Sequence, residues 1–324
     1  MGSVPEQVLP VISLQSDTLA RDLYQACKET GFFYLTDHGI SPDILNNVLS
    51  LARRFFLETA EDSKSKIQRK PVHEGGDGAR GYQVLNENVT KGKRDYHEAV
   101  DFYREWDHCN DEDVDGSRGY QFLRGPNLWP EHPPELKQLL QDYIEQCQNV
   151  GTRVVKAMGE ALGEGDVFVR ATRKSFWVFR MIGYPPLQGG DAHEGISCGE
   201  HTDYGCVTLL LADDTVGALQ VQAKDGTWIN ADPIPNAFVV NIGDMMERWT
   251  NGEWKSTNHR VVHRGSNYRV SAPFFFEPDF DAEVAPLPKC VERTGGKALY
   301  GSVVYGEHLT AKASTNFYSG GIEE

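Results

Sequence analysis

The stretch CVTLLLADDTVGALQVQAKDGTWINADPIPNAFVVNIGD, residues 206–244, contains four short runs rich in β-branched and aromatic residues. The pair Asp225-Gly226 between two of these runs is typical of a hairpin turn. Similar runs rich in β-branched and aromatic residues occur on both sides of this stretch, in SFWVFRMIGY (175–184), STNHRVVH (256–263) and YRVSAPFFF (268–276). Seven or more short strands without helices between them predict a mainly β core, a double-sheet jelly roll or a related barrel. The mouth of such a barrel is a common small-molecule site.

The chain before this β-rich region has a mostly helical pattern. Short strands are predicted at PVISL (10–14) and FFYLTDHG (32–39). Ser16 is placed to cap one helix, and Ser41-Pro42 reads as an N-cap followed by proline in the first turn of a second helix. A long helix follows, with apolar residues at helical spacing: Leu136, Leu139, Leu140, Tyr143, Cys147, Val150, Val154 and Met158.

Residues 71–134 are rich in Gly, Asp and aromatic residues and show no clear periodicity. A stretch of this kind in a compact protein is typical of a binding loop or lid. We therefore divide the chain into a helical N-terminal region over 1–170, a jelly-roll core over 171–300, and a C-terminal helix and tail over 301–324. These three segments are expected to form one structural unit.

Composition and charge restrict the class of protein. Of 324 residues, 40% are hydrophobic and 24% charged, which is ordinary for a globular chain. The net charge of −15 and the absence of a Lys/Arg cluster argue against a nucleic-acid partner. No apolar run approaches the ~20 residues that cross a bilayer, and the N-terminus lacks a secretory signal pattern. We expect a cytoplasmic protein with a small-molecule partner and no membrane contact; its oligomeric state is not predicted.

The cysteines do not form a metal-binding pattern. The chain contains six of them, with no C-x-x-C pair: Cys27, Cys109, Cys147, Cys198, Cys206 and Cys290. Structural zinc sites usually show ligands in pairs at short spacing. We therefore expect free thiols in a reducing compartment rather than disulfides or a zinc site.

A metal site is predicted instead around HTD, residues 201–203, at the head of the run VTLLL. Residues i and i+2 of a strand point the same way, so His201 and Asp203 could bind one ion. A third ligand is available on a later β-patterned run, which offers His259 and His263. Two imidazoles and one carboxylate form the facial triad of non-haem Fe(II) oxygenases, which leaves coordination positions open for a co-substrate and dioxygen.

Arg269 and Ser271 follow the predicted metal ligands on another strand and again share a face. A guanidinium beside a hydroxyl is suited to binding a carboxylate. Tyr184 in RMIGYPP could add a phenol donor. The pattern indicates a metal with a nearby anchor for a dicarboxylate.

At this point the chain resembles the isopenicillin N synthase-like family of Fe(II)/2-oxoglutarate-dependent dioxygenases. The resemblance rests on pieces found in the same order along most of the chain: PVISL, GFFYLTDHGI, YPP, HTDYG, VVNIGDMMERWTNGEWKSTNHRV, YRVSAPFFF and YGEHL. It implies a distorted double-stranded β-helix wrapped by helices. It also implies Fe(II) ligation by His201, Asp203 and His259, and 2-oxoglutarate binding by Arg269 and Ser271 with Tyr184. One departure is Ile182, where plant members commonly carry Asn.

The resemblance implies an oxidoreductase that oxidises a C–H bond of a small metabolite in specialised metabolism. Its co-substrates would be 2-oxoglutarate and O2, with ascorbate as a reductant. The outcome would be hydroxylation, or desaturation or ring closure. Halogenation is disfavoured, because the related halogenases have a small residue where this chain has Asp203. The protein would contribute placement and a water-poor cavity.

Strand parity extends the prediction to substrate contacts. Arg180 and Tyr184 share a face, so Arg180 points into the barrel or forms a salt bridge at its wall. Phe275 follows Arg269 and Ser271 inward by the same argument. Tyr204, beside Asp203, and Tyr82, in the loose loop, complete the predicted substrate-binding residues.

Other polar residues are assigned no direct role in the chemistry. The histidines His97 and His193 lack metal-ligand spacing and are expected at the surface or in loops. Asn241 and Asp244 are expected to serve the fold. Two alternative functions remain from the sequence: an iron-dependent oxidase of the same fold that does not use 2-oxoglutarate, and a non-catalytic ligand-binding module.

Overall fold

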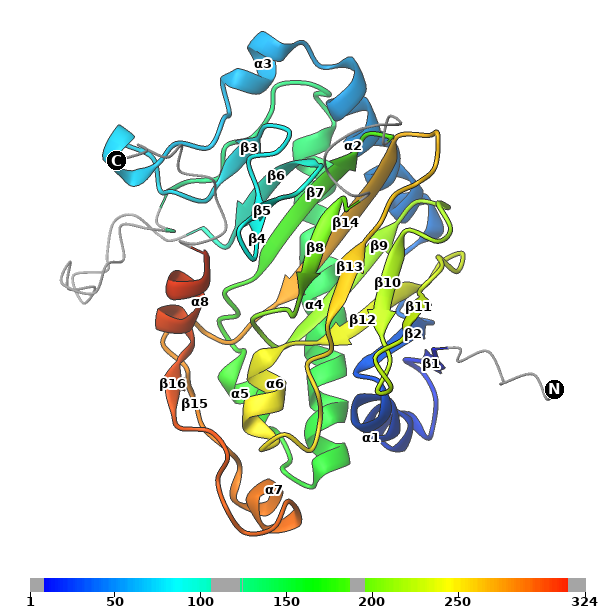
Figure 1. Ribbon diagram of the computed structural model, residues 1–324, viewed down its shortest axis with the longest axis vertical. Coiled ribbons are helices and arrows are strands. Elements are labelled where there is room, and N and C mark those ends of the chain that lie inside the picture. Colours follow the sequence, from blue (N-terminus) through cyan, green and yellow to red (C-terminus); the bar gives the residue numbers. More distant parts are fainter. Residues whose placement is uncertain (1–8, 106–122, 124, 187–195, 314–324) are drawn as a thin grey trace.

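A computed structural model describes residues 9–105, 123, 125–186 and 196–313. Its larger sheet has eight strands in the order β1-β2-β12-β9-β14-β7-β6-β3 (Figure 1). Their bounds are β1 Val11–Ser13, β2 Phe32–Thr36, β3 Gly81–Gln83, β6 Glu98–Tyr103, β7 Val178–Tyr184, β9 Val207–Ala212, β12 Phe238–Ile242 and β14 Arg269–Phe276. Every pairing in this sheet is antiparallel except that of β1 with β2.

The smaller sheet has four antiparallel strands in the order β11-β10-β13-β8. They are β8 Cys198–His201, β10 Leu219–Gln222, β11 Trp228–Asn230 and β13 His259–Val261. Two small hairpins lie outside the main sheets: β4 Val89–Thr90 with β5 Lys93–Arg94, and β15 Glu283–Val284 with β16 Val303–Val304. The predicted jelly-roll core is confirmed, because the short runs of residues 175–276 form two largely antiparallel sheets.

The helices flank this core. They are α1 Leu19–Glu29, α2 Pro42–Glu58, α3 Glu61–Ser65, α4 Leu136–Leu162, α5 Val167–Ala171, α6 Asp244–Trp249, α7 Pro288–Arg293 and α8 Tyr305–Ala313, with a 3-10 turn at Val72–Glu74. The predicted cap of α2 is confirmed, since Ser41 Oγ accepts a hydrogen bond from the Asp43 amide at 3.2 Å. The predicted Ser16 cap is wrong. The Ser16 hydroxyl accepts from the Thr18 amide, and α1 begins only at Leu19.

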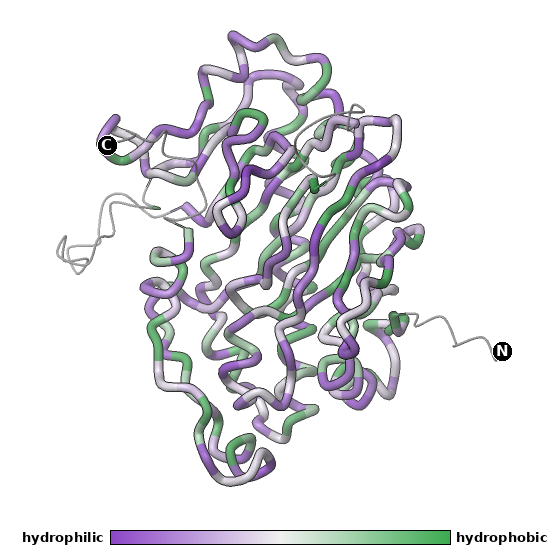
Figure 2. The backbone as a smooth tube through the Cα atoms, in the orientation of Figure 1, coloured by the Kyte–Doolittle hydropathy of each residue, from purple (hydrophilic) through white to green (hydrophobic). Residues whose placement is uncertain are grey.

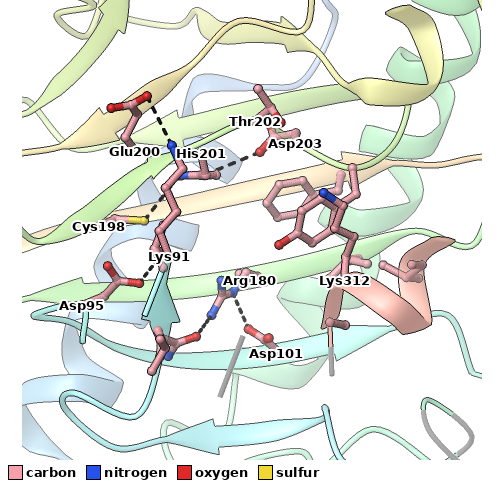
Figure 3. A pocket seen from close by; sticks show the side chains of 18 of the residues that line it. Lys91, Asp95, Asp101, Arg180, Cys198, Glu200, His201, Thr202, Asp203 and Lys312 are labelled. Atoms are coloured by element: carbon pink, nitrogen blue, oxygen red, sulfur yellow. Dashed lines mark hydrogen bonds and ion pairs between the residues drawn. The ribbon is translucent and has the colours of Figure 1, made fainter. Parts of the chain in front are cut away.

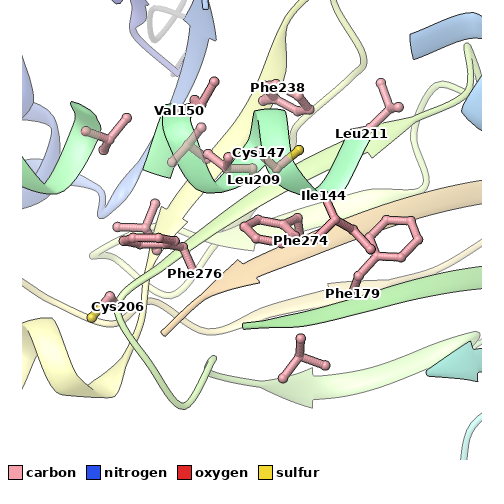
Figure 4. Close-up of a cluster of buried hydrophobic side chains, with 14 of the residues drawn as sticks. Ile144, Cys147, Val150, Phe179, Cys206, Leu209, Leu211, Phe238, Phe274 and Phe276 are labelled. Atoms are coloured by element: carbon pink, nitrogen blue, oxygen red, sulfur yellow. The ribbon is translucent and has the colours of Figure 1, made fainter. Parts of the chain in front are cut away.

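The long helix α4 covers one face of the larger sheet (Figure 4). Its apolar stripe packs on side chains of β9, β14 and β7, including Leu209, Phe274 and Phe276. The helix approaches the sheet closely at Gly151, where an added Cβ would lie 2.5 Å from Phe276 Cγ. Figure 2 shows hydrophobic and hydrophilic residues alternating along several strands, as expected where one sheet face is buried. Among the described residues, no helix is both long and apolar enough to span a bilayer.

The stretch 71–134 is more regular than expected where it is described. Its residues form β3 to β6, and β6 lies inside the larger sheet between β7 and β3. All six residues of β6 are buried. No period-2 pattern appears in this strand because polar residues such as Glu98 and Asp101 are buried beside apolar ones. Residues of the β4–β5 hairpin, together with Asp101 and Tyr103 of β6, line the main cavity, so this stretch forms part of the cavity wall.

Candidate functional site

Three predicted metal ligands meet at one end of the smaller sheet. His201 ends β8 and lies opposite His259, the first residue of β13. Their ring centroids are 4.3 Å apart. Asp203 follows β8 by two residues, and its Oδ1 lies 3.7 Å from His201 Nε2 and 3.6 Å from His259 Nε2. All three ligand atoms lie within 4.8 Å of one another, so one metal ion can be bound by all three.

Hydrogen bonds fix the orientation of each ligand. His201 Nδ1 lies 2.7 Å from the Gly199 carbonyl oxygen, and His259 Nδ1 lies 3.1 Å from the Thr257 carbonyl oxygen. Because a carbonyl can only accept, each Nδ1 carries the proton and each Nε2 presents a lone pair toward the shared centre.

Hydrogen bonds also fix the Asp203 carboxylate, on the oxygen that faces away from the two imidazoles. Its Oδ2 accepts from Asn241 Nδ2 at 2.6 Å and from the Thr208 hydroxyl. Oδ1 is thereby left to face the two imidazoles. Asn241, which was expected to serve the fold, therefore also orients a predicted metal ligand.

The local electrostatics suit a divalent ion. Burial, helped by His201, lowers the pKa of His259 to about 4, so its ring is neutral near pH 7. Burial would raise the pKa of Asp203, but His259, His201 and the two hydrogen bonds together lower it below its ordinary value. Two neutral imidazoles and one carboxylate are the donor set of non-haem Fe(II) sites, so the residues fit ferrous iron.

The predicted carboxylate anchor is formed by paired residues of β14 and β7. Arg269 is opposite Tyr184, and its guanidinium lies 4.6 Å from the centre of the Tyr184 ring. Arg269 is only 2% exposed, yet its Nε and Nη1 have no hydrogen-bond partner among the described residues. A buried, unpaired guanidinium is costly. The arrangement therefore fits an anionic ligand.

Two hydroxyl groups complete this anchor. Ser271 is buried two residues after Arg269 and pairs with Ile182, which supplies only an aliphatic side chain. Burial raises the pKa of Tyr184, so its phenol remains protonated and able to donate. The Arg269, Ser271 and Tyr184 side chains lie next to the main cavity rather than in its lining.

The main cavity has a volume of about 460 Å³ and includes His201 and Asp203 in its lining. Figure 3 shows these two residues on one side, with Arg180 and Asp101 across from them. The predicted substrate residues Arg180, Tyr204 and Phe275 also line it. Arg180 combines both expected roles, since it lines the cavity and forms an ion pair with Asp101 at 2.6 Å.

Tyr82 is not brought to the cavity. It is 4% exposed, and its hydroxyl donates to Glu98 Oε2 at 2.6 Å. Its ring packs on Phe55 in the core. The sequence placed Tyr82 in a loose loop, whereas it lies in β3 at the edge of the larger sheet.

The other described histidines considered in the sequence are not part of the metal-binding group. His263 Nε2 lies 2.7 Å from the Asn267 carbonyl oxygen, so His263 is engaged away from the metal-binding group. His97 was expected at the surface or in a loop; it lies in the loop before β6, but it is buried, at 1% exposed, and lines the cavity. His193 lies outside the described residues. The five described cysteines are free thiols, as expected.

Known proteins share this fold and a large part of this sequence. Residues 172–278 match the 2OG-Fe(II) oxygenase superfamily, and residues 9–132 match the N-terminal region of the non-haem dioxygenases in morphine synthesis. A homoarginine-6-hydroxylase of Glycine max is 43% identical over 305 residues, covering 92% of this chain and 89% of the soybean protein. This chain belongs to the 2OG-Fe(II) oxygenase superfamily.

Two further relatives support the assignment. A homoarginine-6-hydroxylase of Oryza sativa subsp. japonica is 42% identical over 316 residues, covering 96% of this oxygenase and 91% of the rice protein. The crystal structure of a full-length Neurospora crassa protein in complex with alpha-KG superposes with a TM-score of 0.80 at 25% identity, covering 97% and 98% of the two chains. The chain is thus a 2-oxoglutarate-dependent non-haem iron dioxygenase that oxidises a C–H bond of a small molecule.

This family assignment decides between the functions left open by the sequence. Fe(II) and 2-oxoglutarate are the cofactor and co-substrate of the superfamily, and the metal-binding group and the unpaired Arg269 fit both. The oxidase that does not use 2-oxoglutarate and the non-catalytic binding module are therefore set aside.

Asn241 provides a first test of the site. Asn241→Ala removes one of the two hydrogen bonds that orient the Asp203 carboxylate. Such outer partners typically contribute about 10- to 100-fold to metal affinity. We expect iron affinity, measured by competition with a chelator, to fall by this factor. Asn46→Ala on the exposed face of α2 is the control and should leave affinity unchanged. Equal affinities for the two variants would contradict the role of Asn241.

Proposed function

We propose that this oxygenase hydroxylates a basic amino acid of the homoarginine type, with His201, Asp203 and His259 holding the iron. Arg269, Ser271 and Tyr184 would bind the distal carboxylate of 2-oxoglutarate. When bound, ferrous iron and 2-oxoglutarate supply the oxidising power: 2-oxoglutarate, O2 and the substrate give succinate, CO2 and the hydroxylated product.

The protein's own residues place the reactants. Arg269 neutralises the far carboxylate of 2-oxoglutarate, while the hydroxyls of Ser271 and Tyr184 donate to it. The side chains of Tyr204 and Phe275 form an apolar wall of the cavity near Asp203 and limit the access of water. No side chain is required to act as a general acid or base, because the proposed chemistry removes a hydrogen atom rather than a proton.

The substrate class is supported first by the relatives named homoarginine-6-hydroxylase, at 43% and 42% identity over nearly the full chain. The cavity is consistent with such a substrate. Its lining is mixed in charge: acidic Asp95, Asp101, Glu200, Asp203 and Glu277, and basic Lys91, Arg180 and Lys312. A volume of about 460 Å³ suits a molecule of amino-acid size. Charges of both signs suit a zwitterion with a cationic side chain better than a neutral aromatic compound.

The direct test supplies purified protein with Fe(II), 2-oxoglutarate and O2, with and without homoarginine. We expect homoarginine to increase succinate formation at least about 10-fold over uncoupled turnover, and mass spectrometry to find one added oxygen per succinate formed. Lysine, arginine and thymine serve as comparison substrates. The proposal fails if homoarginine neither increases succinate formation nor gains oxygen, while another compound in the panel does.

A further inference from the structure

His97 presents an unused acceptor to the cavity. Its Nδ1 lies 2.8 Å from the Ser197 carbonyl oxygen, which can only accept, so Nδ1 carries the ring proton. The opposite nitrogen, Nε2, is buried and has no hydrogen-bond partner among the described residues. Burial lowers the pKa of His97 to about 4, so the ring is neutral near pH 7. Nε2 can therefore only accept a hydrogen bond.

Arg180 presents a donor to the same cavity. Its Nε donates to Asp101 at 2.6 Å, and its Nη2 donates to Gln83 at 2.9 Å and to Asn88 at 3.0 Å. No described residue accepts a hydrogen bond from Nη1, and the side chain is 22% exposed. Hydrogen bonds from Nε and Nη2 thus fix the guanidinium in place, while Nη1 remains able to donate. This arrangement suits binding of a carboxylate.

The two unused groups are close to each other and to the metal-binding residues. His97 directly precedes β6, and its ring lies 5.6 Å from that of Tyr184. The ionisable groups that act on His97 are Asp95, Arg180 and His201. An acceptor beside an acidic residue and a guanidinium donor therefore line the same cavity as His201 and Asp203.

We propose that His97 and Arg180 bind the α-amino and α-carboxylate groups of the amino-acid substrate. Arg180 Nη1 donates to the carboxylate, and His97 Nε2 accepts from the ammonium group, with the Asp95 carboxylate adding a favourable field. The side chain of the substrate then extends across the face of the metal site. This inference rests on the proposed function and adds which part of the substrate is recognised, and by which residues.

A second metal site is the competing explanation for this part of the cavity, because Asp95, His97 and Cys198 also lie within 4.8 Å of one another. Both Asp95 oxygens are already engaged. Oδ1 accepts from the Gly199 amide at 2.7 Å, and Oδ2 accepts from the Thr90 hydroxyl at 2.7 Å. The Asp95 carboxylate thus fixes the β4–β5 hairpin to β8. The remaining His97 acceptor and Arg180 donor fit the ammonium and carboxylate groups of an amino acid better than they fit a metal cation.

The first arm of the test uses the unaltered enzyme and three ligands: homoarginine, its α-N-acetyl derivative, and 5-guanidinopentylamine, which lacks the carboxylate. A hydrogen bond to a charged group contributes about 1.5–3 kcal/mol, which is about 10- to 150-fold in affinity. We expect kcat/KM to fall by at least 10-fold for each altered ligand. If homoarginine itself is not oxidised, the proposed function fails together with this inference. If all three ligands react equally well, this inference alone is overturned.

The second arm compares His97→Asn with His97→Gln. The Asn amide can still donate to the Ser197 carbonyl from the position of Nδ1 but provides no acceptor at the position of Nε2, whereas the Gln oxygen can reach that position. We expect His97→Asn to raise the KM for homoarginine about 10- to 100-fold, with less than a 3-fold change in the KM for 2-oxoglutarate, and His97→Gln to recover part of the loss. A homoarginine KM within 2-fold of the unaltered enzyme in His97→Asn, or equal losses in both variants, would overturn the role of His97. His73→Gln, at an exposed histidine, is the control.

Discussion

Replacing His259 with alanine is expected to abolish stable iron binding and to lower succinate formation more than 100-fold. The loss of an outer partner of a metal ligand already costs about 10- to 100-fold, and here the ligand itself is removed. His201 and Asp203 would remain, but two donors hold a divalent ion far more weakly than three. The measurement is iron content after desalting, together with succinate formation at saturating 2-oxoglutarate.

Two comparisons make this result specific to the metal site. His73 is an 80% exposed histidine outside the cavity lining, so His73→Ala should retain iron and activity. Circular dichroism of His259→Ala should match that of the unaltered enzyme, because His259 begins a three-residue strand and is not part of the main hydrophobic cluster. Full iron occupancy in His259→Ala would mean that the ligand set is wrong.

Replacing Arg269 with glutamine is expected to raise the KM for 2-oxoglutarate by at least 30-fold. Truncation of one partner of a buried charge pair costs about 2–5 kcal/mol, which corresponds to about 30- to several thousand-fold in affinity. Arg269 qualifies because it is buried, and two of its nitrogens are otherwise unpaired among the described residues. The KM for homoarginine should change much less, since the Arg269 side chain lies outside the cavity lining.

Arg269→Lys separates charge from shape. A lysine keeps the positive charge but loses the planar fork that matches a carboxylate, so its KM for 2-oxoglutarate should lie between those of the unaltered enzyme and Arg269→Gln. Arg54→Gln, at a 43% exposed position on α2, is the matched control. An unchanged KM for 2-oxoglutarate in Arg269→Gln, with a raised KM for homoarginine, would move Arg269 from the co-substrate to the substrate.

The sequence predicted the barrel well because its signal is local. Short β-rich runs, hairpin turns and strand parity determine which residues share a face, and these features place His201 with Asp203 and Arg269 with Ser271. Which distant strands pair with each other cannot be predicted from the sequence of either strand alone. That β8 and β13 bring His259 opposite His201 was inferred from the family resemblance, and the structure shows it in the register of these two strands.

The residues missed by the sequence analysis are those whose role depends on burial and long-range contacts. His97 was expected at the surface or in a loop, and its burial was missed because the run DYHEAVD gives no sign that the polar strand β6 is buried between β3 and β7. Tyr82 was assigned to the substrate, although β3 directs it to Glu98 and the core. The contact between Asn241 and Asp203 spans 38 residues, and only tertiary structure reveals it.

The most direct test of the site is a crystal structure grown anaerobically with Fe(II) and 2-oxoglutarate, with the iron located by its anomalous scattering. The expected result is a single iron peak within bonding distance of His201 Nε2, Asp203 Oδ1 and His259 Nε2, and the far carboxylate of 2-oxoglutarate on Arg269 and Ser271. Iron bound instead at Asp95, His97 and Cys198, or a co-substrate that leaves Arg269 unpaired, would contradict it.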